Sequence, residues 1–180
     1  LGFFATDGRA FTVKGADLPR GRGDGQPVRL MIDLSDDEEL ISIFVLTEGG
    51  RRLVASSAGR GMVVEDDALV AEKRSGRQVL NLKEGEYSKL CIPAQGDTVA
   101  VLGDNRRLLV FPLEQLPVMA RGLGGALQKY TDGGVRQAGG VEAAQGREGP
   151  GRVRARGRVE GQEGEGKREG AGERGAGGGP

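Results

Sequence analysis

Three similar segments recur in this chain of 180 residues at intervals near fifty, and this repeat most limits the folds open to it. In each segment an apolar run meets a short turn, an Arg follows, and a second apolar run leaves. The three residues are Arg9, Arg60 and Arg106, which lie 51 and 46 residues apart. A Leu and then a basic, Gly-containing stretch follow each Arg, at 20–25, 73–76 and 121–125. A period near fifty is typical of propeller blades, which must stack because no single blade buries its apolar face alone.

The apolar runs have the length and the Val, Ile and Phe content of β-strands. Turn pairs such as Asp7-Gly8 and Asp104-Asn105 separate them, and these residues tolerate the positive φ of tight hairpins. The expected strands lie at 2–6, 10–13, 28–33, 40–47, 53–57, 61–64, 79–82, 87–92, 98–102 and 108–111. The only helical pattern is a turn or two at 113–119. The pattern predicts an all-β fold, a partial β-propeller or β-pinwheel of about three four-stranded blades.

A closed propeller usually has at least four blades, so three units predict an incomplete ring. We therefore expect further blades N-terminal to residue 1.

The composition changes abruptly near residue 134. Residues 134–180 use only eight residue types, none of them a large apolar residue, and 16 of these 47 positions are Gly. Such a stretch cannot bury enough apolar surface to offset the entropy of ordering it. The sequence therefore predicts a folded repeat region at 1–133 and a low-complexity, disordered tail at 134–180. The Arg cluster at 152–158 of this tail is interpreted either as a flexible arm for nucleic-acid phosphates or as a solvated linker. A shifted reading frame in a G+C-rich gene is a third interpretation of the tail.

The composition also excludes several kinds of site. The chain has no His and one Cys, Cys91, so a Ser-His-Asp or Cys-His nucleophile pair and an internal disulfide are impossible. One thiol cannot supply the ligands of an ordinary zinc site. No apolar run approaches the ~20 residues of a membrane-spanning helix.

Three local segments resemble the C-terminal β-pinwheel domain of the type IIA topoisomerase A subunits, that of bacterial DNA topoisomerase IV in particular. They are Pro27–Asp33, Gly76–Asn81 and Leu108–Leu113 with Leu116-Pro117. The gyrase members carry a Gln-Arg-Arg-Gly-Gly-Lys-Gly box, which neither 20–25 nor 121–125 matches, so the resemblance favours topoisomerase IV. The family's nucleophilic Tyr lies N-terminal to this domain, and neither Tyr87 nor Tyr130 is assigned its role.

The resemblance implies that the repeat region binds and bends duplex DNA and carries no catalytic residue. The basic stretches then supply the candidate phosphate contacts, which are Arg20, Arg22, Lys73, Arg74, Arg77 and Arg121. It also implies a cytoplasmic, nucleoid-associated enzyme in which Mg²⁺ and ATP act outside this stretch. The B subunit of topoisomerase IV is the implied partner in a heterotetramer.

Two other interpretations stay open from the residues alone. One is a propeller-type module for protein interaction, and the other is a truncated or frame-shifted product without function. Arg9, Arg60 and Arg106 are interpreted either as further rim cations or as residues that lock their turns and pair with a neighbouring blade.

Overall fold

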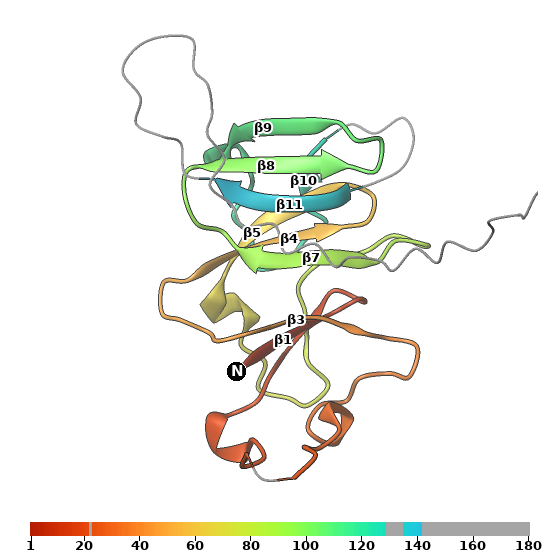
Figure 1. Cartoon of the computed structure of the whole chain (residues 1–180), viewed down its shortest axis with the longest axis vertical. Coiled ribbons are helices and arrows are strands. Elements are labelled where there is room, and N and C mark those ends of the chain that lie inside the picture. Colours follow the sequence, from red (N-terminus) through yellow and green to blue (C-terminus); the bar gives the residue numbers. More distant parts are fainter. Residues whose placement is uncertain (22, 129–134, 142–180) are drawn as a thin grey trace, which may run out of the picture.

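The computed structural model describes residues 1–21, 23–128 and 135–141, and in residues 135–141 only the backbone. These residues form three antiparallel sheets that follow one another along the long axis of the molecule (Figure 1). The first sheet has the order β3-β1-β2-β6, the second β10-β5-β4-β7 and the third β11-β8-β9. The all-β fold class and the pinwheel-like blades predicted from the sequence are confirmed. The strands are β1 (Gly2–Ala5), β2 (Arg9–Thr12), β3 (Leu40–Phe44), β4 (Arg51–Ser56), β5 (Arg60–Glu65), β6 (Arg77–Gln78), β7 (Ser88–Pro93), β8 (Thr98–Gly103), β9 (Leu108–Pro112), β10 (Gly125–Ala126) and β11 (Val135–Val141).

The first two sheets each take one edge strand from the following repeat. Strand β6 pairs with β2 across 65 residues of chain, from Thr12 to Arg77, and β10 pairs with β5 in the same way. Each of these short strands is followed by an aliphatic residue that is fully or almost fully buried, Val79 in one repeat and Leu127 in the next. The exchange ties each sheet to its neighbour, because a blade is complete only when the next repeat is in place.

The core lies between the sheets because alternate residues of a strand face opposite sides. Phe4 of β1 and Val54 of β4 belong to one apolar cluster between the first and second sheets. The neighbouring residue Leu53 belongs to a second cluster, between the second and third sheets. The other face of the first sheet is covered by the loop at 14–34, which contributes Ile32. The second sheet is therefore apolar on both faces.

A buried ion pair fastens the segment that joins the first and second sheets. Arg52 of β4 lies 2.9 Å from the Asp66 carboxylate, and both side chains are buried. The guanidinium also covers the ring of Phe44, 3.8 Å from its centroid, and donates to the Val45 carbonyl at 3.0 Å. Asp66 Oδ2 accepts from the Thr47 amide at 3.0 Å. These contacts offset the desolvation that a buried pair of charges requires.

Two of the predicted strands differ in the structure. Residues 28–33 contain a 3₁₀ turn, η2 (Val28–Leu30), and the pairing predicted at 79–82 lies instead at Arg77–Gln78. The segment at 77–80 lies 48 residues before its equivalent at 125–128 and 48 after 29–32. The later copies meet the edge of the preceding repeat's sheet, and no such sheet lies among the described residues for Val28–Leu30. The predicted helical turn is confirmed only as η4 (Leu113–Gln115).

Strand β11 lies within the range that the sequence analysis expects to be disordered. It pairs with β8 from Val135↔Gly103 to Val141↔Thr98. Backbone pairing of this kind requires no large side chain, so composition alone gives little sign of it. The remainder of the predicted tail, 142–180, lies outside the described residues.

The third hairpin is shifted by one residue from the register that the sequence suggests. Gly8 and Gly59 have φ of 79° and 81° in the first two turns. In the third turn the residue with positive φ is Arg106, at 62°. Arg106 is therefore the equivalent of the two glycines, and its equivalence to Arg9 and Arg60 is wrong.

The side-chain hydrogen bonds of the turns give the same register. Asp7 Oδ1 accepts from the Arg9 amide at 3.0 Å, and Asn105 Oδ1 accepts from the Arg107 amide at 3.0 Å. Arg107 is thus the third post-turn Arg. The sequence has two adjacent arginines and no Gly at this turn, so matching Arg to Arg could not choose between them.

Candidate nucleic-acid interface

Four cations converge where the first and second repeats meet. Strand β6 places Arg77 opposite Ala10, which follows Arg9 on β2. The Arg9 guanidinium donates to the Ser75 carbonyl at 3.0 Å, which brings the turn at 73–76 against the first hairpin. We call the residues Arg9, Lys73, Arg74 and Arg77 the basic edge. Three of the six predicted DNA contacts lie in it.

Two members of the basic edge already have carboxylate partners. Arg9 forms an ion pair with Asp7 and lies 5.2 Å from the centroid of Phe11. Its role as a turn-locking residue that reaches the next repeat is therefore confirmed. Arg74 lies 3.6 Å from Asp33 and donates to the Leu30 carbonyl at 2.6 Å, although its side chain remains 61% exposed.

Lys73 and Arg77 are the more available cations of the basic edge. Both are exposed, and neither forms an ion pair with another residue of the part that the structure describes. They line a shallow hollow of about 470 Å³ together with Asp67 and Glu72. The field there is therefore mixed, with the cations on the strand side.

Lys14 is a cation that the sequence analysis missed. It lines a second hollow, of about 670 Å³, together with Lys73 and Arg74. Asp17 and Glu72 lie in the same lining. No local sequence signal marks Lys14, because its neighbours come from a segment about sixty residues away in the chain.

Arg121 occupies the position in the third repeat that Lys73 occupies in the second. The Asn81 amide donates to the Gly122 carbonyl at 2.8 Å, and the Asp33 amide donates to the Arg74 carbonyl at 2.9 Å, both with the same spacing of 48 residues. Arg121 is exposed, and its Nε donates to Asn81 Oδ1 at 3.2 Å. The equivalence repeats an exposed cation on successive blades.

The two remaining predicted contacts lie in the loop between η1 (Gly15–Asp17) and η2. Arg20 is exposed there, and its side chain forms no ion pair with another described residue. Arg22 lies outside the described residues. The structure thus does not bring this pair to the basic edge.

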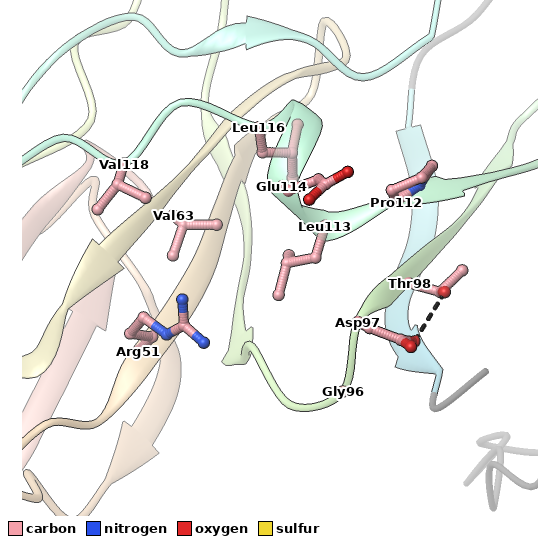
Figure 2. Close-up of a pocket in the computed structure, with 10 residues that line it drawn as sticks. All are labelled: Arg51, Val63, Gly96, Asp97, Thr98, Pro112, Leu113, Glu114, Leu116 and Val118. Atoms are coloured by element: carbon pink, nitrogen blue, oxygen red, sulfur yellow. Dashed lines mark hydrogen bonds between the residues drawn. The ribbon is translucent and has the colours of Figure 1, made fainter. Parts of the chain in front are cut away.

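A third cleft, of about 810 Å³, separates the second and third sheets (Figure 2). Arg51 extends into it from the second sheet, while Glu114 and Asp97 line it from the third. Thr98 donates to Asp97 Oδ1 at 2.9 Å. Cation and carboxylates face one opening, so this cleft is less suited to an anion than the basic edge.

The buried thiol and the carboxylates offer no catalytic centre within the described part of the chain. Burial raises the pKa of Cys91 to about 12, which keeps the sulfur protonated and unreactive. Among residues 1–21, 23–128 and 135–141, no group of three or more acidic or thiol side chains is placed to hold a metal ion. Over the same residues, no helix has the length and apolar character needed to cross a membrane.

Known proteins match the repeat region in sequence. The family described as the DNA gyrase C-terminal domain, a beta-propeller, matches residues 3–47 and 97–134. The A subunit of DNA topoisomerase 4 from Caulobacter vibrioides is 44% identical over 133 residues, which are 74% of this chain and 17% of that protein. The Rickettsia bellii protein of the same name is 35% identical over 126 residues, 70% of this chain and 17% of its own length. The chain thus spans about a sixth of these relatives.

Solved structures match the fold. The C-terminal domain of Escherichia coli ParC superposes with a TM-score of 0.74 at 23% identity, covering 78% of this chain and 61% of that domain. The DNA gyrase A C-terminal domain superposes with a TM-score of 0.58 at 16% identity, covering 76% of this chain and 46% of that domain.

Proposed function

The repeat region belongs to the C-terminal β-pinwheel family of the DNA topoisomerase IV and DNA gyrase A subunits, and on that premise we propose that it binds duplex DNA through the basic edge. The observation that carries the proposal is the convergence of Lys73, Arg74 and Arg77 on the first hairpin through the β2–β6 pairing. Lysine and arginine bind phosphates by releasing condensed counterions, and they read little sequence in doing so.

The repetition of cations supports a track rather than a single contact. Arg121 repeats the position of Lys73 on the next blade. Successive blades therefore offer phosphate ligands at a regular interval, which suits a continuous polyanion better than a small one. The backbone of a duplex carries such evenly spaced charges along its length.

Within a complete topoisomerase IV, this region would hold and bend the DNA segment that is to be transported. It would thereby support ATP-dependent strand passage, decatenation and relaxation in the cytoplasm, beside the B subunit in a heterotetramer. Strand cleavage, Mg²⁺ and ATP would act on other parts of that enzyme, and we assign no catalytic residue here.

Fluorescence anisotropy with a labelled duplex tests the proposal in the full chain. The variant Lys73→Gln with Arg77→Gln removes two available cations of the basic edge. We expect weaker binding and a plot of log K against log salt whose slope is smaller by about two, one for each lost phosphate contact. The matched control is Arg51→Gln with Lys83→Gln, which removes the same charge from two exposed residues outside the basic edge. The control is expected to change the slope by less.

Other results would support the alternatives. Equal effects of the two double variants would refute a localised edge. Loss of binding only after replacement of the arginines at 152–158 would assign the affinity to the Arg arm. No salt-dependent binding by a folded chain would leave the interaction module or the non-functional product.

A further inference from the structure

The outer edge of the third sheet lacks the strand that completes the other two, within the part of the chain that the structure describes. In the first repeat the Gly8 carbonyl accepts from the Val79 and Leu80 amides at 3.1 and 3.0 Å. In the second, the Gly59 carbonyl accepts from the Leu127 amide at 2.8 Å. Among the described residues, no strand pairs with the equivalent edge of β9. This edge is therefore a strand acceptor in two repeats and lacks a described partner in the third.

The side chains of β9 are correspondingly exposed. Phe11 of β2 and Met62 of β5 are fully buried, whereas the equivalent Leu109 is 39% exposed. Leu108 and Val110 are 65% and 40% exposed. An edge strand with an exposed apolar row is a ready template for pairing with another strand.

The register shows which backbone groups are available. The Gly103 amide donates to the Arg107 carbonyl at 3.0 Å. Because bonded pairs alternate in an antiparallel ladder, Leu109 and Phe111 also bond towards β8. Leu108 and Val110 therefore present their amides and carbonyls outward, and Pro112 presents a carbonyl.

We propose that β9 pairs antiparallel with β9 of a second copy of this chain, about a two-fold axis at Val110. The two Val110 residues then exchange amide-to-carbonyl hydrogen bonds, and each Leu108 amide donates to a Pro112 carbonyl. The two three-stranded sheets become one six-stranded sheet. This proposal does not depend on the proposed function.

Charge complementarity favours a second copy as the occupant. In this register Arg106 of one copy lies opposite Glu114 of the other, and the axis repeats the pair. Both side chains are exposed, and neither forms an ion pair within the part of the chain that the structure describes. The apolar stripe of each copy meets itself across the axis.

The chain's own tail fits the edge less well. The strands that complete the first two sheets are followed by buried aliphatic residues, Val79 with Leu80, and Leu127. Residues 142–180 contain two valines, at 153 and 159, and no larger aliphatic residue. A tail strand would leave most of the exposed apolar row uncovered.

Sedimentation velocity of the full chain over a wide concentration range tests the pairing. We expect a monomer–dimer equilibrium. Val110→Lys places like charges directly opposite each other and is expected to give a monomer at every concentration. Val70→Lys is the control, since this valine is similarly exposed, at 42%, and lies in the second repeat. Circular dichroism establishes that both variants fold.

A charge exchange tests the register itself. Glu114→Arg alone and Arg106→Glu alone each place like charges together, and we expect dimer dissociation constants about three- to tenfold higher. The combined variant restores an opposite pair and is expected to recover most of this loss.

Three results would overturn the proposal. One is a wild-type chain that stays monomeric throughout. Another is a dimer that Val110→Lys and the charge variants leave unchanged. The third is a monomer whose Leu108 and Val110 amides are protected from hydrogen exchange, which would assign the edge to a segment of the same chain.

Discussion

Replacing Arg106 with Gly is expected to stabilise the fold, because Arg106 holds a backbone conformation that favours Gly. Its φ is 62°, and the two equivalent turns have Gly at this position. The left-handed conformation costs a residue with a side chain about 1–2 kcal/mol. Gly gives back part of this gain, about 0.5–1 kcal/mol, through the greater freedom of the unfolded chain. The net expectation is a stabilisation of about 0.5–1 kcal/mol.

Urea unfolding of the full chain measures this change. With a slope of about 2 kcal/mol per molar, the midpoint rises by about 0.3–0.5 M. The measurement is made at protein concentrations low enough that self-association does not contribute. Arg107→Gly is the matched control. It removes the adjacent Arg, whose φ is not positive and whose amide is bonded to Asn105, and it is expected to destabilise by about 0.5–1 kcal/mol.

The pair of variants decides between two registers of the third turn. If Arg107→Gly stabilises and Arg106→Gly destabilises, then Arg106 is the post-turn residue that the sequence suggested, and the shift by one residue is wrong. If both destabilise equally, the positive φ at Arg106 is not the dominant strain in the turn.

Three further predictions concern the buried groups and the second turn. Arg52→Met leaves Asp66 buried without its partner and should lower the free energy of unfolding by about 3–5 kcal/mol, whereas Arg51→Met on the exposed side of the same strand should change it by less than about 0.5 kcal/mol in calorimetry. The pKa of Cys91 is raised to about 12 in the folded chain, so its thiol contributes fully below the ordinary value near 9 and stability declines as pH rises from 9 towards 12; a Cys91→Ala variant that shows the same decline in urea titrations would contradict this cause. Ala58→Asp gives the second turn the carboxylate that Asp7 provides in the first, and the added bond to the Arg60 amide should raise the urea midpoint by the equivalent of about 0.5–1 kcal/mol, an effect that Ala58→Leu should not reproduce.

The candidate interface was predictable only in part. The basic turn at 73–77 and its copy at Arg121 follow from the repeat, because their spacing of 48 residues is visible in the sequence. Which cations are already neutralised is not visible. Arg9 and Arg74 have carboxylate partners, while Lys73 and Arg77 have none among the described residues, and this difference depends on side chains brought together from distant segments. Lys14 joins the group only through packing.

The sequence by itself determined the fold class, the number of repeats and the position of most strands. Alternating apolar residues and turn signals act over a few neighbours, and the period near fifty requires stacked units. Tertiary structure decided what depends on a partner strand. The equivalents of Val28–Leu30 become edge strands where the preceding repeat offers a sheet edge, and Val28–Leu30 itself remains a 3₁₀ turn. It also decided the register at Arg106, because the pairing of β8 with β9, rather than the identity of the residue, sets which position takes positive φ.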